Sequence, residues 1–288
     1  MYYLIIAILT ATAILLAFKI AGKFNANNLH IVTINYFVAA CLGMIISINQ
    51  GSSINYFNYD WFGWSILYGV FFILGFLLFG YSTQKSGISA TAISSRVSVI
   101  IPVIFGFFLF KEAINNYIII GIIVAILALI LINLPAGNAK ALKNTGTKVN
   151  MIMFVPILLF FVIGINDTII KIAQHYLIKN NDYSEFISSG FFFSSLTGVV
   201  IMLIKKNWKV KLSSIIIGFI LGIINYINFR SLIIGLGEMP VTVFMPVYNI
   251  GVVVLSLLIG IIAFKEKVSP TNIIGIVLAI LAIILLTI

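Results

Sequence analysis

The chain has 288 residues, of which 62% are hydrophobic and only 8% are charged. Soluble domains are about 45–50% apolar and about 25% charged, so this composition excludes a water-soluble globule, and its apolar content excludes a disordered chain. The net charge of +10 is typical of basic loops held on one side of a membrane, and we expect no nucleic-acid partner.

Apolar runs follow one another along the whole chain. A membrane-spanning helix needs about 20 apolar residues, whereas a spanning strand would show about ten residues of alternating polarity. Residues 118–132 are continuously apolar, which favours helices. The sequence therefore predicts an all-α, multi-pass protein of the lipid bilayer. Its ten predicted helices cover residues 2–21, 30–48, 61–82, 87–109, 115–134, 151–172, 184–204, 211–235, 238–264 and 269–287.

The polar segment 135–150 divides the chain into two halves, residues 1–134 and 151–288. The second half repeats the first at a constant offset of 154 residues, and 12 of the 21 positions from 111 to 131 are identical at this offset. The match includes charged residues, because Lys111-Glu112 recurs as Lys265-Glu266. Shared apolar composition does not explain a repeated charged pair.

Each half contains five predicted helices, so the second half must enter the membrane from the opposite side. Inverted repeats are common in secondary transporters, which bind substrate near the membrane midplane and expose it alternately to the two sides. We therefore predict ten transmembrane helices in two inverted five-helix repeats. The alternative is a duplicated scaffold without a transport path.

The fourth and ninth predicted helices end alike, with a glycine five residues before a Lys-Glu pair. With this motif and its five-plus-five repeat, essentially the whole chain resembles the bacterial EamA-type permeases of the drug/metabolite transporter superfamily. The resemblance implies a permease or exporter of small metabolites in the bacterial cytoplasmic (inner) membrane, without naming the cargo. The residues that carry it are Gly106, Lys111, Glu112, Gly260, Lys265 and Glu266, and the helix-closing Lys19 and Lys171.

Polar side chains inside a membrane span usually face a cavity or one another, so they are the candidate site. Thr91, Ser95 and Ser98 share one face of the fourth helix, either as a cavity wall or as interhelical hydrogen bonds. Arg96 lies beside that face, where it either holds a neighbouring helix or binds an anionic substrate group.

The sixth predicted helix contains Asn166, Asp167 and Lys171. Asp167 stands four residues before Lys171, a spacing that pairs an acid with a base along a helix. It is also the one carboxylate predicted well inside a span, so it is a candidate proton carrier and a candidate partner of Arg96. The other candidate binding residues are Asn35 and Tyr36 in the second helix, Asn225, Asn228 and Arg230 in the eighth, and Tyr248 and Asn249 in the ninth, with helix bends expected at Pro102 and Pro246.

Small residues at helical spacing mark the fifth and tenth predicted helices. They allow close approach of a neighbouring helix, either in peripheral packing or in a dimer contact, so monomer and homodimer both stay open. The residues are Gly121, Ala125 and Ala128 in the fifth helix, and Gly275, Ala279 and Ala282 in the tenth.

These features predict a secondary transporter of small polar or amphipathic metabolites, first of all amino-acid-like compounds, that works by alternating access with proton coupling or exchange. The alternatives are a drug or cation exporter of the same fold, a transport-inactive membrane enzyme or scaffold, and a passive channel. The sequence has no phosphate-binding loop, zinc-ligand spacing or Ser-His-Asp set, so we expect no enzymatic activity, no metal and no cofactor.

The distribution of lysines bears on membrane orientation. With ten spans both termini lie on one side, which carries 3 of the lysines, while the opposite side carries 12. The positive-inside rule places the termini outside the cytoplasm, whereas the resemblance implies cytoplasmic termini.

Overall fold

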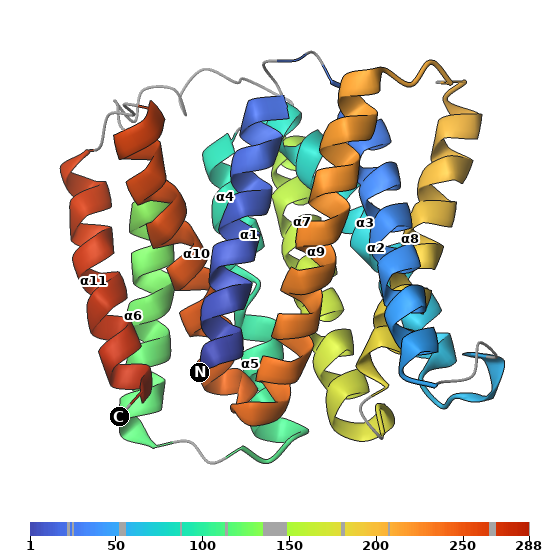
Figure 1. The fold of residues 1–288 in the computed structure, drawn as a ribbon. Coiled ribbons are helices and arrows are strands. Elements are labelled where there is room, and N and C mark those ends of the chain that lie inside the picture. The colour runs from blue at the N-terminus through green and yellow to red at the C-terminus, as the bar shows by residue number, and fades with distance from the viewer. Residues whose placement is uncertain are drawn as a thin grey trace. The chain divides into compact units, whose positions relative to one another are not determined.

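The structure is a computed structural model that describes residues 1–21, 24, 26–51, 56–86, 88–112, 115–134, 149–179, 182–206, 208–264 and 269–287. All regular structure within these residues is helical (Figure 1). The helices are α1 Tyr2–Ala21, α2 Asn28–Asn49, α3 Phe62–Ser86, α4 Ile88–Val97, α5 Ile100–Phe108, α6 Asn116–Asn133, α7 Val149–Ile172, α8 Tyr183–Ile204, α9 Leu212–Glu238, α10 Val241–Phe264 and α11 Pro270–Thr287, with short turns of 3₁₀-helix at Tyr56–Asn58 (η2) and of π-helix at Ala173–Leu177 (η4).

These helices lie within a few residues of the ten predicted ranges. Nine described segments are long and apolar enough to cross a membrane, and α1 contains a shorter apolar helix, Tyr2–Phe18. The chain is therefore an all-helical, multi-pass membrane protein, as the composition predicts. Three parts of the sequence interpretation, the linker segment 135–148, the pair Lys265-Glu266 and the side chain of Lys19, lie outside the described residues.

The fourth predicted span is broken into α4 and α5 at Ser98 and Val99. Pro102 has no amide hydrogen and its ring clashes with the carbonyl four residues earlier, which here belongs to Ser98. That carbonyl accepts instead from the amide of Ile101, at 2.9 Å. The expected bend at Pro102 is thus an interruption of the helix, whereas α10 continues through Pro246.

The chain forms two compact units, each with pieces of both sequence halves. Unit 1 consists of Met1–Ile73 and Ile169–Glu238, and unit 2 of Leu74–Thr168 and Met239–Ile288. In unit 1, α2 packs against α8 and α9, and α1 packs against α9. Its core contains an aromatic cluster in which Tyr36 stacks on Phe191 at 5.5 Å between ring centroids and Tyr68 contacts Phe229 at 4.9 Å.

Unit 2 contains α6 packed against α11, with α10 against α5, α6 and α11. The small residues predicted to permit close helix approach are buried, including Ala128 and Ala282 at 0% exposure. A Cβ atom on Gly121 would lie 2.9 Å from Leu286 Cγ, and one on Gly275 would lie 2.7 Å from Ile132 Cγ1. The small-residue stripes of α6 and α11 therefore allow close packing within one chain.

Candidate functional site

Unit 2 brings together charged and polar side chains from three helices. Arg96 lies in the last turn of α4, just before the break at Ser98. Its Nη1 donates a hydrogen bond to Asn249 Oδ1 of α10 at 3.1 Å. Asp167 of α7 and Tyr248 of α10 also interact electrostatically with the guanidinium. We call these four residues, Arg96, Asp167, Tyr248 and Asn249, the Arg96 cluster.

The backbone of each helix sets the direction of these groups. Asn249 Nδ2 donates to the Met245 carbonyl one turn earlier, at 3.0 Å, so its Oδ1 is the atom that accepts from Arg96. Helix α7 reaches the break in the fourth span because Gly164 has no side chain: a Cβ there would lie 2.8 Å from the Ser98 carbonyl oxygen. Gly164 stands one turn before Asp167, so close packing at the break holds the acid near Arg96.

The Arg96 cluster uses few of its hydrogen-bonding groups. Among the described residues, the half-buried Asp167 carboxylate makes no hydrogen bond or ion pair. Asn166, which precedes it in α7 and is not part of the cluster, has a buried Oδ1 without a hydrogen-bond partner. Arg96 has several N–H donors and uses one of them on Asn249. Buried charges are costly unless they are paired, so these groups favour a polar or charged ligand.

The hydroxyl groups predicted to line the fourth helix bond within the protein. Ser95 and Ser98 donate to backbone carbonyls of their own segment, Ala92 at 3.0 Å and Ser95 at 2.8 Å. Thr91 shares a hydrogen bond with Ser82 of α3 at 2.7 Å. Their place in a substrate path therefore stays a prediction.

Unit 1 holds the other candidates, in pairs across helices. Asn225 Nδ2 donates to Asn35 Oδ1 at 3.2 Å, which joins α9 to α2. Asn228 Nδ2 donates to the Ala7 carbonyl at 2.8 Å and to Thr10 Oγ1 at 3.0 Å, which joins α9 to α1. These three hydrogen bonds each join two different helices of unit 1.

The cationic candidates of unit 1 also bond to protein groups. Lys171 Nζ donates to the Leu236 carbonyl at 2.6 Å and to Gln174 Oε1 at 3.1 Å. Arg230 Nη1 lies 3.4 Å from both Ser184 Oγ and Tyr226 Oη. The Tyr36 ring is buried in the aromatic cluster of this unit.

Glu185 is a buried acid that sequence reasoning missed. It lies in the first turn of α8 at 1% exposure, and its Oε1 accepts from Ser47 Oγ of α2 at 2.9 Å. Asp182 stands three residues earlier, the spacing of a helix-capping pair. That spacing could have drawn attention to Glu185, but the Asp182 side chain makes no capping hydrogen bond, and Glu185 Oε2 has no hydrogen-bond partner among the described residues.

Comparison with known proteins finds a family whose sequence pattern matches part of the chain. Residues 1–134 match the EamA-like transporter family. The N-terminal part of the chain is thus similar to the EamA-like transporter family.

Two full-length similarities accompany this match. An uncharacterized protein of Haemophilus influenzae is 27% identical over 295 residues, which cover 98% of this chain and 96% of the relative. One crystal structure of a protein aligns with a TM-score of 0.77 at 14% identity, over 99% of this chain and 94% of that one. The structural match shows a shared fold.

Proposed function

We propose that this protein is an EamA-like transporter that carries small zwitterionic, amino-acid-like metabolites across the bacterial cytoplasmic membrane. The observation that carries the proposal is the Arg96 cluster, in which a guanidinium and a carboxylate interact electrostatically while using few protein partners. An α-amino acid has the complementary pair of charges. Its carboxylate would take the free N–H donors of Arg96, and its ammonium would donate to Asp167.

The balance of charge favours a zwitterion over a cationic drug. Arg96 and Asp167 together have no net charge, and a neutral zwitterion leaves neither of them buried without a counter-charge. A monovalent cation would pair with Asp167 and leave Arg96 unmatched. Tyr248 and Asn249 would add hydrogen bonds to the bound solute.

Transport would proceed by alternating access between two inverted repeats, residues 1–134 and 151–288, joined by the segment 135–150. The close contacts of unit 2 support the repeat. Gly121 packs on Leu286 and Gly275 packs on Ile132, and both the glycines and their partners are 154 positions apart. Each contact joins the start of one helix to the end of the other, as an antiparallel pseudo-twofold pair requires.

The break in the fourth span supports a moving part beside the cluster. Interrupted helices are common where transporters bind substrate, and Arg96 stands at the interruption made by Pro102. Asp167 is the candidate for carrying a coupling proton, and exchange of one solute for another is the second mode of coupling that fits.

Thermal stabilisation of the purified protein tests the substrate class. A ligand that binds only the folded state raises stability by RT ln(1 + [L]/Kd). The panel contains L-amino acids, their carboxamides, their deaminated acids, nucleosides, sugars and cationic drugs. We expect a dose-dependent shift with an amino acid, and smaller shifts with the carboxamide and the deaminated acid, because each lacks one of the two charges.

Other outcomes would overturn the proposal in different ways. Stabilisation by a cationic drug and by no amino acid would make the chain a cation exporter. A blank panel would favour a scaffold or membrane enzyme that has lost transport. Flux of the stabilising amino acid into proteoliposomes should saturate, and flux without saturation would indicate a passive channel.

A further inference from the structure

Glu112 binds the start of α10 through both carboxylate oxygens. Its Oε1 accepts from the Val241 amide at 2.7 Å, and its Oε2 accepts from the Thr242 amide at 3.0 Å and from Thr242 Oγ1 at 2.8 Å. The first amides of a helix have no partner within the helix and carry partial positive charge. A carboxylate is the strongest acceptor that a side chain can offer them.

The rest of the motif places that carboxylate. Lys111 has a left-handed backbone with φ of 51°, which turns the chain back after α5, and the Glu112 amide donates to the Gly106 carbonyl at 3.2 Å. A Cβ on Gly106 would lie 2.7 Å from Val241 Cγ1 and 2.9 Å from Thr242 Cγ2. Gly106 and Glu112, both residues of the repeated sequence motif, therefore contact the N-terminus of α10.

Helix α10 carries half of the Arg96 cluster. Tyr248 and Asn249 lie about two turns after the amides that Glu112 binds. We propose that Glu112 is a positioning residue for the solute site: it fixes the axial position and rotation of α10, so that Asn249 Oδ1 meets Arg96. The effect on solute affinity rests on the proposed function, whereas the effect on α10 does not.

Hydrogen–deuterium exchange of the solute-free protein tests the effect on α10. We compare the wild type with Glu112→Ala, and with Glu112→Gln in case the alanine variant does not fold. Amides of residues 241–245 should exchange about tenfold faster in Glu112→Ala, because local opening no longer breaks bonds to a carboxylate. Glu112→Gln, which keeps one acceptor oxygen, should fall between the two.

Asn272→Ala is the matched control. Asn272 Nδ2 caps the end of α6 by donating to the carbonyls of Leu131 at 3.2 Å, Ile132 at 2.8 Å and Leu134 at 3.0 Å. Its loss should lower stability as well, yet leave exchange at 241–245 within about twofold of wild type. Unchanged exchange in both Glu112 variants, or equal acceleration in Asn272→Ala, would overturn the positioning role.

The second arm uses an amino acid that stabilises the wild type. Its affinity should fall about tenfold in Glu112→Ala, a typical coupling between neighbouring sites, and remain within about twofold in Asn272→Ala. Equal affinity in Glu112→Ala would overturn the positioning role. If no amino acid stabilises the wild type, the proposed function fails by itself, and the exchange experiment alone decides the role of Glu112.

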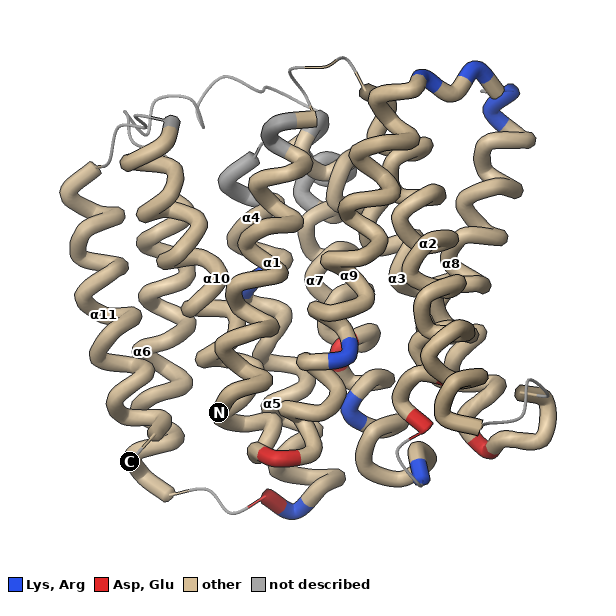
Figure 2. The backbone as a smooth tube through the Cα atoms, viewed as in Figure 1, with Lys and Arg blue, Asp and Glu red and all other residues tan. Residues whose placement is uncertain are grey.

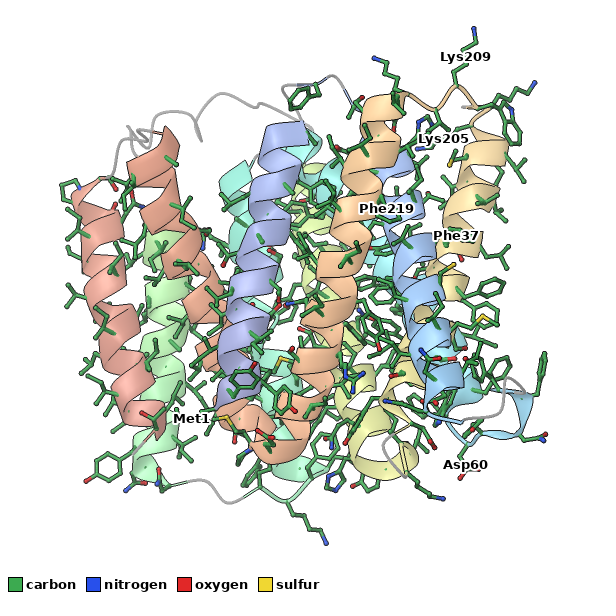
Figure 3. All side chains as sticks on the ribbon, in the orientation of Figure 1. Met1, Phe37, Asp60, Lys205, Lys209 and Phe219 are labelled. Atoms are coloured by element: carbon green, nitrogen blue, oxygen red, sulfur yellow. The ribbon has the colours of Figure 1, made fainter. Side chains whose placement is uncertain are left out.

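A separate observation concerns the connection between α8 and α9. Within residues 205–211 the chain has Lys205, Lys206, Lys209 and Lys211 and no acid, and all four lysines are exposed. Figure 2 shows these basic residues gathered beyond the ends of α8 and α9, and Figure 3 shows Lys209 pointing away from the helices. Trp208 between them is 57% exposed.

At the opposite end of unit 1, charged groups of opposite sign are paired with one another. Lys179 bonds to Asp60 at 3.1 Å, and the N-terminal ammonium lies 3.7 Å from Glu238. Both flanks of the 205–211 segment are apolar helices that can cross a membrane, so the segment lies at a membrane surface. We infer that it binds the headgroups of anionic phospholipids, with Trp208 at the interface between headgroups and acyl chains.

Native mass spectrometry with added phosphatidylglycerol or phosphatidylcholine tests this inference. The wild type should retain phosphatidylglycerol preferentially, and free glycerol phosphate should not compete. The combined variant Lys205→Gln, Lys206→Gln and Lys209→Gln should bind phosphatidylglycerol about a hundredfold less tightly, since each lysine near an anionic surface contributes about fivefold. The control, Lys111→Gln with Lys179→Gln, should bind as wild type does. Equal retention of the two lipids, or unchanged binding by the triple variant, would overturn it.

Discussion

Units 1 and 2 both carry polar side chains inside apolar helices, but the two sets differ in what they bond to. In unit 1, Asn35, Asn225 and Asn228 bond to other helices of the same unit, and Lys171 is bonded to a backbone carbonyl. In unit 2, Asp167 has no hydrogen bond among the described residues, and Arg96 uses one donor. Unit 1 also has one buried carboxylate oxygen, Glu185 Oε2, without a hydrogen-bond partner among the described residues. The feature of unit 2 on which the proposed function rests is therefore the pair of opposite charges, Arg96 and Asp167, with few protein partners.

Arg96→Gln should produce the largest change. Loss of the guanidinium removes the counter-charge for a bound carboxylate, and truncating a buried charged partner costs about 2–5 kcal/mol of binding free energy. The affinity for a stabilising amino acid, measured by titration of the melting temperature, should fall at least about thirtyfold. A variant that binds the amino acid as tightly as wild type would remove Arg96 from the site.

Asp167→Asn should have a smaller but comparable effect. The amide keeps the size of the carboxylate and loses the charge that attracts an ammonium group, so amino-acid affinity should fall about tenfold or more. The deaminated acid offers an internal control, because it lacks the ammonium. Its affinity should not decrease in Asp167→Asn, and a parallel loss for both ligands would contradict the assigned pairing.

Asn228→Ala should affect stability rather than binding. It removes the hydrogen bonds to Ala7 and Thr10, and interhelical hydrogen bonds in membranes contribute about 0.6 kcal/mol each on average. We expect a loss of about 1 kcal/mol in unfolding free energy, measured by denaturant titration in detergent, with amino-acid affinity unchanged. A loss of affinity at full stability would move part of the site into unit 1.

Ser95→Ala should produce the smallest change. Its hydroxyl donates to the Ala92 carbonyl of its own helix. Loss of this contact should change the unfolding free energy by no more than about 0.5 kcal/mol. The same variant decides whether the hydroxyl faces the solute. Amino-acid affinity within about twofold of wild type fits a local backbone contact, whereas a clear loss would extend the Arg96 cluster along α4.

The sequence predicts the helices well because span length is a local property. About twenty consecutive apolar residues predict a transmembrane helix regardless of where the rest of the chain lies. A proline such as Pro102 predicts an interruption of the helix at its own position. Partners are not local: Arg96 meets Asn249 across 153 positions, and Asn225 meets Asn35 across 190. From the sequence alone, both Lys171 and Arg96 were candidate charge partners of Asp167, and spacing did not distinguish between them.

The acids show the same limit. Glu112 belongs to a motif that the sequence reveals by repetition, yet the repeated pair says nothing about Val241 and Thr242, whose amides it binds. Glu185 stands at the start of a predicted span, and its buried contact with Ser47 depends on how α2 and α8 pack. Chemistry that depends on two distant helices needs the structure.

One titration tests the contrast between the two units most directly. Purified wild type, Arg96→Gln and Asn228→Ala are titrated with the same stabilising amino acid, and the melting temperature and affinity are read from each series. The account predicts that Arg96→Gln loses affinity, whatever its unliganded melting temperature, while Asn228→Ala melts earlier and keeps its affinity. The reverse pattern, with affinity lost in Asn228→Ala and kept in Arg96→Gln, would contradict it.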